Sequence, residues 1–228
     1  MTKFNPLIFR VIIFTFLSVL TFRQSYLLAK EDPIETINYA VKKAIKLGDA
    51  KLEFFGEEKV EGENCYLIVF TATGFKFYDR EQIYVSSKDY YPVLVKRDLN
   101  IAGTKELIEE RYSRKDNQVE ITNTDSKGKV KKTTLSSKKR MENIYGFIYR
   151  YRVQGEFKIG EEITVNLPTK EVKIKLEEKK KISVAGKEYN AYFMSGRAHN
   201  IRIWFDDGPK KIPLRIDGSL GIGSTAMV

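Results

Sequence analysis

Residues 201–216 read IRIWFDDGPKKIPLRI, and this stretch decides the fold. Apolar residues recur at every second position on both sides of an Asp-Asp-Gly-Pro corner at 206–209. A period of two indicates a strand with one buried face, and Asp and Gly tolerate the dihedral angles of a tight turn. Pro209 has no backbone N–H, so it cannot extend the first strand. The stretch predicts a β-hairpin whose buried face comprises Ile201, Ile203, Phe205, Ile212, Leu214 and Ile216.

The same rhythm recurs along most of the chain. Residues 65–73 are almost continuously apolar, which is typical of a strand covered on both faces. Pro92 cannot donate to a ladder and marks the start or the edge of its strand. Segments about ten residues apart and joined by short turns predict an antiparallel meander. The expected strands are 51–56, 65–73, 78–86, 91–97, 105–113, 118–123, 161–167, 172–184 and 188–195.

Two segments interrupt this rhythm. Residues 127–140 are the most polar part of the chain and are expected to include a mobile loop at a solvated hairpin tip. Residues 141–152 carry an apolar stripe at helical spacing, which predicts one short helix lying against the sheet. The stripe is formed by Ile144, Phe147, Ile148 and Tyr151. A binding role for Tyr145, Tyr149 and Tyr151 is the alternative, but core packing is the more common use of such aromatic residues.

The N-terminal segment predicts export. Residues 11–22 form an apolar run that follows Lys3 and Arg10 and has the length of a secretory signal core, short for a membrane span. Small Ala29 offers a cleavage edge, so residues 1–29 are expected to be a signal peptide. An uncleaved anchor is the alternative. A single domain over residues 30–228 would then lie in the periplasm or cell envelope. No cysteine ends the apolar run, which excludes a lipid-modified N-terminus.

Composition describes the surface rather than the fold. The net charge is +10 over 228 residues, and 42% of the residues are hydrophobic. This charge permits contact with anionic lipid, polysaccharide or nucleic acid. Abundant Lys, Glu and Ile also fit a heat-adapted surface, so no partner is required. We expect no nucleic-acid partner, because an exported protein rarely meets one, and membrane contact only through the N-terminal segment or by proximity.

No recognisable catalytic motif is found. A Gly-x-Ser-x-Gly elbow is absent, and His199 has no serine or cysteine partner at a telling position. Cys65 lies among apolar strand residues and is expected to be a buried small hydrophobe. Glycines at 218–223 lack the helix that a phosphate loop needs, and the paired acids Asp206 and Asp207 suit a turn. We therefore expect no enzyme, no catalytic residue, no metal and no cofactor.

The closing hairpin also carries a family resemblance. The stretch at 203–216, followed by GSLGIGSTA at 218–226, resembles the C-terminal signature of the domain-of-unknown-function family 3108. Residues 157–161 resemble its apolar-Lys-x-Gly-acid step, and residues 184–189 resemble its glycine-turn hairpin. The resemblance runs from about Ile37 to Ala226. It implies an exported protein of bacteria with two membranes, and it offers no catalytic residue to transfer.

The resemblance also bears on the fold. It implies an open, curved antiparallel sheet, similar in outline to the incomplete barrels of lipoprotein carriers. Residues 31–47 fit a helix slightly better than a strand by periodicity alone, but family members begin with a hairpin, so a hairpin is predicted here. The expected fold is mainly β: an open, curved antiparallel sheet, or incomplete barrel, with one short covering helix.

Three functional hypotheses follow from these observations. The first is a non-enzymatic envelope protein that holds an apolar or lipid-like ligand, or an envelope partner, in the concave face of its sheet. The second is a structural or interaction module whose concave face is filled by its own side chains. The third is an enzyme, which clustered polar groups with perturbed titration on the concave face would favour. No ligand-binding residue is assigned, and the oligomeric state is left open.

Overall fold

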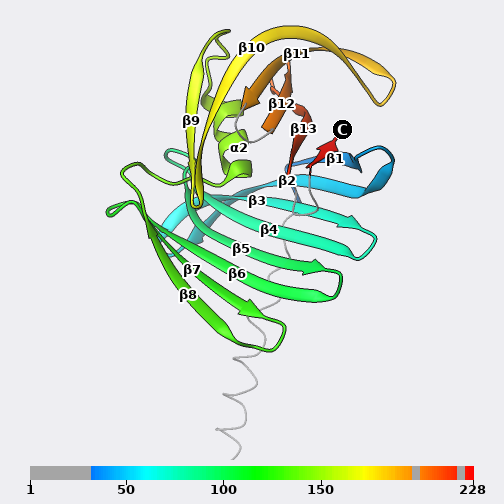
Figure 1. Ribbon diagram of the computed structural model, residues 1–228. Coiled ribbons are helices and arrows are strands. Elements are labelled where there is room, and N and C mark those ends of the chain that lie inside the picture. Colours follow the sequence, from blue (N-terminus) through cyan, green and yellow to red (C-terminus); the bar gives the residue numbers. More distant parts are fainter. Residues whose placement is uncertain (1–31, 197–200, 220–223) are drawn as a thin grey trace, which may run out of the picture. The chain divides into compact units, whose positions relative to one another are not determined.

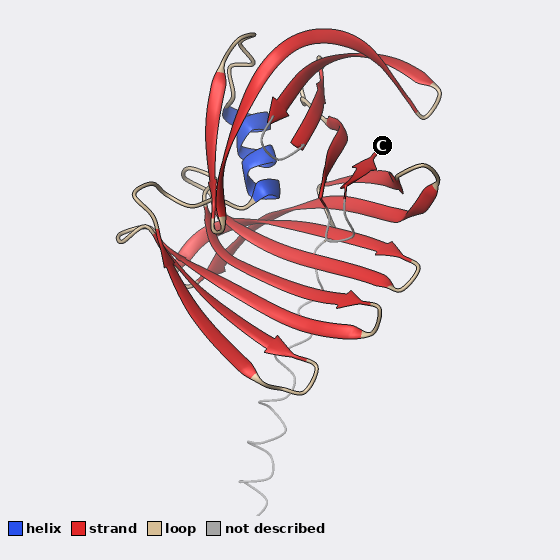
Figure 2. Ribbon diagram, viewed as in Figure 1, coloured by secondary structure: helices blue, strands red, loops and turns tan. Residues whose placement is uncertain are grey.

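The computed structural model describes residues 32–196, 201–219 and 224–228, and Pro33–Val228 forms one compact unit. In this unit, one open antiparallel sheet of 14 strands bends around α2 (Ile144–Gln154), the one helix of the described residues (Figures 1 and 2). This confirms the predicted fold class. The strands are β1 (Glu35–Lys42), β2 (Lys46–Val60), β3 (Glu63–Gly74), β4 (Phe77–Ser86), β5 (Pro92–Ile101), β6 (Thr104–Ser113), β7 (Gln118–Asp125), β8 (Val130–Ser136), β9 (Glu162–Leu167), β10 (Lys170–Val184), β11 (Lys187–Gly196), β12 (Ile201–Asp206), β13 (Pro213–Ser219) and β14 (Ser224–Met227).

The sheet consists of two meanders joined at a central seam. Strands β1–β8 follow one another outward on one side, and β14 back to β9 do so on the other. The seam is the antiparallel pair β1–β14, in which Val41 faces Met227. Ala40 and Val228 extend it by exchanging two backbone hydrogen bonds of 2.9 and 3.1 Å. Strands distant in sequence therefore meet in the middle of the sheet, whereas β8 and β9 form its edges.

We call the sheet face that packs against α2 the concave face. The ring of Phe70 in β3 stacks on Tyr145 of α2, with centroids 4.2 Å apart. Gly146 brings the helix close to β4, because a Cβ added there would lie 3.4 Å from Val85. These contacts belong to one continuous core, and each large apolar side chain buried in it contributes roughly 1.5–3 kcal/mol. The helix therefore occupies the concave face rather than merely flanking it.

The polar stretch at 127–140 contains a strand between its turn and loop residues, which the sequence did not predict. Val130–Ser136 forms the edge strand β8, which pairs with β7 over seven positions from Gln118 to Thr124. Most of its side chains are exposed on both faces. An edge strand without a buried face carries no apolar period, which explains why the pattern did not reveal it. The expected solvated hairpin is present as the β7–β8 pair.

Three other predicted elements need adjustment. Helix α2 begins at Ile144 rather than at 141, because the N–H of Glu142 donates to Asn166 of β9 at 2.7 Å. Strand β2 is much longer than 51–56 and follows a hairpin turn after β1, which confirms the predicted N-terminal hairpin. In the closing hairpin, a register shift places Pro213 opposite Phe205. Pro213 is buried while Leu214 is half-buried, so the predicted alternation is wrong at these two residues.

Within the described ranges, no helix has the length and apolarity needed to cross a bilayer. The predicted signal segment, residues 1–29, lies outside the described residues.

Candidate functional site

A cleft lies on the concave face between the sheet and the N-terminal end of α2. It comprises two adjoining cavities of about 260 and 200 Å³, which share Glu81, Arg97, Ile144 and Leu167 as lining residues. Strands β4–β7 line one side of the larger cavity, and the start of α2 together with the β9–β10 turn at 168–169 lines the other. We call these two cavities the concave-face cleft.

An ion-pair group of two buried carboxyl groups and one half-buried arginine forms the polar end of this cleft. Arg97 donates two hydrogen bonds of 2.7 and 2.6 Å to Asp79 on the neighbouring strand. The guanidinium also lies 3.4 Å from Glu81. Burial disfavours a charged arginine, but the two carboxylates outweigh this effect and raise the pKa of Arg97 above its ordinary value. The guanidinium therefore stays charged inside the cleft.

Glu81 connects this group to the helix. The side-chain amide of Asn143 donates to Glu81 at 3.1 Å. The amide oxygen of Asn143 accepts from the N–H groups of Tyr145 and Gly146 at 2.9 and 3.3 Å, which caps α2. Burial raises the pKa of Glu81 to about 7, although Arg97 opposes the shift. Asn143 therefore contacts both the first turn of the helix and a carboxyl group whose pKa is close to neutral pH.

A second carboxyl group lies on β6. Glu110 accepts a hydrogen bond from Tyr112 two residues further along the same face of the strand. Burial raises the pKa of Glu110 and holds that of Tyr112 well above its ordinary value. Val95, Ile108 and Ile121 line the same cavity, so apolar walls adjoin the polar end. The arrangement suits a ligand with one apolar part and one hydrogen-bonding part.

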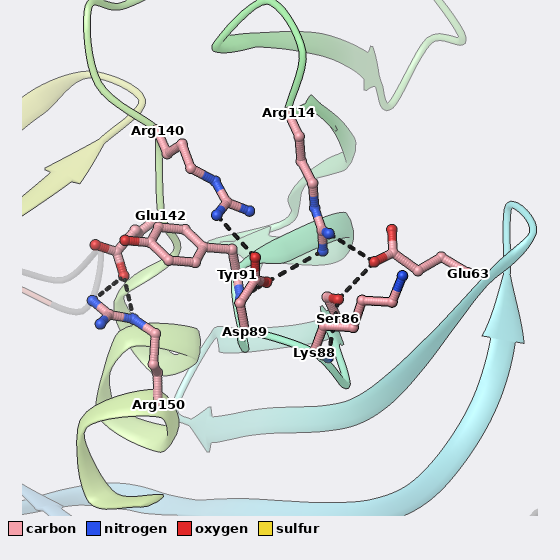
Figure 3. Close-up of polar contacts among 9 residues, drawn as sticks. All are labelled: Glu63, Ser86, Lys88, Asp89, Tyr91, Arg114, Arg140, Glu142 and Arg150. Atoms are coloured by element: carbon pink, nitrogen blue, oxygen red, sulfur yellow. Dashed lines mark hydrogen bonds and ion pairs between the residues drawn. The ribbon is translucent and has the colours of Figure 1, made fainter. Parts of the chain in front are cut away.

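A separate polar network fastens the connector between β8 and α2, and Figure 3 shows it. Arg140 and Arg114 both point toward Asp89, at 2.9 and 3.4 Å. Arg114 also pairs with Glu63 at 2.8 Å, and Ser86 donates to Glu63 at 2.6 Å. Burial favours a neutral Asp89, but the hydrogen bonds from Arg140 and Tyr91 prevail and lower its pKa. The network joins β3, the β4–β5 turn, the β6–β7 turn and the connector.

Helix α2 is attached to the same region. Arg150 pairs with buried Glu142 at 2.8 Å. Tyr91 contacts both sides of the junction, since Arg140 lies 3.9 Å and Arg150 4.9 Å from its ring centroid (Figure 3). Every carboxylate in Figure 3 faces an arginine, so we assign this network to holding α2 in place rather than to ligand binding.

The structure buries several residues that the sequence singled out. Cys65 is fully buried, and burial raises the pKa of its thiol to about 11, as expected for a small hydrophobe. Tyr145 and Tyr151 belong to the core, as predicted. Tyr149 stacks on Phe54 with centroids 4.9 Å apart. The aromatic residues of α2 therefore pack against the sheet.

The remaining singled-out positions do not lie at the cleft or fall outside the described residues. Asp206 accepts from the N–H of Ile212, and Asp207 pairs with Lys179 at 2.5 Å, so both acids brace the β12–β13 turn. His199 and residues 220–223 of the glycine stretch lie outside the described residues. Among those described, no three His, Cys, Asp or Glu side chains gather as metal ligands would.

No sequence motif indicated the polar end of the cleft. Asp79 and Glu81 occupy the same face of β4 as Phe77, Ile83 and Val85, all of which are buried. Charged residues at the apolar positions of an alternating strand were a signal that could have revealed them. Arg97 could be identified as the partner of these carboxylates only from the register of β4 and β5, because that register places it opposite Glu81.

A family model described as "Protein of unknown function (DUF3108)" matches residues 36–228. The chain belongs to the DUF3108 family. The match confirms the resemblance and agrees with its predicted extent, and it covers all residues of the concave-face cleft. Neither the comparison with curated proteins nor that with solved structures finds a match. The function of this DUF3108 protein must therefore be argued from its own side chains.

Proposed function

We propose that this DUF3108 protein is an exported, non-enzymatic protein of the cell envelope that binds a lipid-like amphiphile in the concave-face cleft. The N-terminal apolar run at 11–22 supports export. The observation that carries the binding proposal is the cleft itself, in which apolar walls of β5–β7 adjoin the ion-pair group. Small-molecule sites combine such walls with a few placed polar groups.

The side chains suggest how such a ligand would lie. Its apolar part would contact Val95, Ile108 and Ile121 in the larger cavity. Its polar part would meet Glu81 and Glu110, beside Arg97, which already donates to Asp79. Three carboxyl groups surround the one arginine, so the cleft offers no uncompensated positive charge to an added anion. A neutral or cationic head group that donates hydrogen bonds therefore fits better than a fatty-acid carboxylate.

The raised pKa of Glu81 favours one alternative, an enzyme that uses this group as an acid or base. The contacts of Glu81 argue for a structural role instead. One oxygen accepts from Asn143, the other lies against Arg97, and the residue is 7% exposed. A group that must exchange protons with a substrate needs a free approach. We therefore assign Glu81 to organising the cleft.

The packing of α2 favours another alternative, an interaction module without a ligand. Stacking of Tyr145 on Phe70 and of Tyr149 on Phe54 already fills part of the concave face. If the remaining cavities hold only solvent, the protein would act through its outer surfaces. Binding measurements distinguish the two functions.

The test combines extraction with a matched pair of variants. The full chain is purified without detergent exchange, and native mass spectrometry then looks for a bound lipid. Monoacylglycerol (neutral), a long-chain alkylamine (cationic) and a fatty acid (anionic) of equal chain length are added separately, and the melting temperature is recorded. We expect the first two to stabilise the protein more than the fatty acid.

Ile108→Arg places a charge in the cleft, and Leu107→Arg places the same charge on the opposite face, where Leu107 is 58% exposed. We expect Ile108→Arg to abolish lipid-induced stabilisation and Leu107→Arg to keep it. Ile121→Gln serves as a milder cleft variant if Ile108→Arg does not fold. Absence of any lipid-induced shift in the wild type would support the module without a ligand.

A further inference from the structure

Four hairpin turns line up at the same ends of strands β1–β8. They are the turns at 43–45, 75–76, 102–103 and 126–129, and Figure 1 shows them in a row. Antiparallel pairing places every second turn at the same edge. The register confirms their adjacency, since Gly48 faces Gly74 beside the first two turns and Phe77 faces Ile101 beside the next. We call this row the turn edge.

Two large apolar side chains project from the turn edge. Phe75 is 87% exposed and Ile45 is 72% exposed, the former being the most exposed large hydrophobic residue described. The fold does not require apolar residues at these positions, because turns favour Gly, Asn, Asp and Ser. Exposed apolar residues at neighbouring loop tips are a common mark of an interaction surface.

Exposed lysines accompany these apolar side chains in the same row of turns. Lys76 lies 5.4 Å from the ring centroid of Phe75. Of the lysines at the turns, only Lys46 forms an ion pair within the described part of the chain, with Asp49. Asp125 accepts from two backbone N–H groups of its own turn, and Glu106 accepts from Asn123. The exposed lysines of the turn edge are Lys42, Lys43, Lys46, Lys76, Lys105, Lys127 and Lys129.

The opposite edge of the same strands has a different character. Its turns contribute Asp89 and Arg114, which pair with each other and with neighbouring charged residues. Lysines occur there too, at Lys59, Lys88 and Lys115, but no side chain of the exposed large hydrophobic class lies beside them. Unpaired cations and projecting apolar residues thus coincide at the turn edge alone among these described turns.

We propose that the turn edge docks on an anionic lipid surface. The lysines would lie at the level of the anionic head groups, and Phe75 and Ile45 would enter the boundary between head groups and acyl chains. Cations near an anionic leaflet and apolar side chains inserted at the interface reinforce each other, since each lysine contributes through electrostatics and each apolar group through burial. This inference does not depend on ligand binding in the cleft.

A fluorescent reporter tests the contact at the turn edge itself. Phe75→Trp is introduced into the full chain, whose natural Trp204 is 7% exposed and serves as an internal reference. Vesicles of phosphatidylcholine are compared with vesicles in which about one third of the lipid is phosphatidylglycerol. We expect the emission of the new tryptophan to shift to shorter wavelength only with the anionic vesicles, and brominated acyl chains to quench it.

Charge reversal provides a matched control. Lys43→Glu, Lys76→Glu and Lys105→Glu are combined at the turn edge, and Lys59→Glu, Lys88→Glu and Lys115→Glu are combined at the opposite edge, both with the Phe75→Trp reporter. We expect the vesicle partition constant, measured from the fluorescence of the reporter, to fall about 100-fold in the first variant. In the second variant it should stay within about threefold of the parent.

A chain that sediments with vesicles while the tryptophan at 75 stays unquenched would overturn the proposal, because residues 1–29 alone would then account for binding. Equal losses in both triple variants would also overturn it, because they would indicate non-specific charge attraction.

Discussion

The side chain of Asn143 contacts Glu81 and caps α2 at the same time. Its amide N–H donates to the carboxylate at 3.1 Å, while its oxygen accepts from the first turn of the helix. These two interactions fix the orientation of the Asn143 amide, because its oxygen can accept from the helix N–H groups but cannot donate to Glu81. Any change in the charge or position of Glu81 therefore acts on the end of the helix that lines the cleft.

The stability of the protein should depend on the protonation of Glu81. Burial raises the pKa of this residue to about 7 from an ordinary 4.5. A carboxyl group with a raised pKa stabilises the fold fully below its unfolded pKa, and this stability is lost as the pH rises through its folded pKa. We expect the free energy of unfolding, measured with urea, to fall by roughly 1–3 kcal/mol between about pH 5 and pH 8.

Glu81→Gln should flatten this profile, because glutamine keeps the hydrogen bond without a charge. A remaining slope is expected from Glu110 and Glu142, whose pKa values burial also raises. The exposed change Glu188→Gln should leave the wild-type profile in place. An unaltered slope in Glu81→Gln would show that another group titrates.

Removing Arg97 should be strongly destabilising. Arg97→Met leaves Asp79 and Glu81 buried without their cation, which typically costs about 3–5 kcal/mol. Adding Asp79→Asn to the same chain removes one unpaired carboxylate and should restore part of the loss. Urea denaturation of both single variants and the double variant gives the coupling energy. Purely additive losses would contradict the ion pair.

The far end of α2 depends on Arg152. This side chain is 8% exposed, donates to both oxygens of Glu35 at 2.5 and 2.9 Å, and donates to the carbonyl of Lys210 at 2.7 Å. We expect Arg152→Ala to lower the free energy of unfolding by about 2–4 kcal/mol, because it leaves the partly buried carboxylate of Glu35 without its cation. The exposed change Lys187→Ala should stay within about 0.5 kcal/mol of the wild type. A similarly small effect of Arg152→Ala would show that the helix end is held by packing alone.

Gly48 is required for the close approach of β2 and β3. A Cβ built at Gly48 would lie 1.9 Å from the carbonyl oxygen of Thr73, which is backbone and cannot swing away. We expect Gly48→Ala to destabilise by about 3 kcal/mol or more. Gly128→Ala is the comparison: its φ of +78° is strained for alanine, but no atom lies within 4 Å, so about 1 kcal/mol is expected. Equal melting temperatures for the two variants would exclude a steric role for Gly48.

Alternation of apolar residues was sufficient to predict an antiparallel meander, because strands with one buried face carry a period of two. The open, curved form of the sheet and the N-terminal hairpin were predicted only from the family resemblance. It failed where that face is absent, as in the edge strand of Val130–Ser136. Charge on the buried face of β4 was visible at Asp79 and Glu81, but its partner Arg97 depended on the strand register. The cleft could not be predicted, because it forms between segments as distant as Ile108 and Leu167.

The seam between β1 and β14 has a consequence for the order of events during synthesis. Val41 and Met227 face each other across it, so almost the whole domain must be synthesised, and in an exported chain also translocated, before this pair can form. Until then, a nascent chain can hold only separate partial sheets, and β1 has an uncovered rim of backbone hydrogen-bonding groups. Before β14 pairs with it, that rim is open to any other extended chain, so pairing between molecules competes with completion of the sheet.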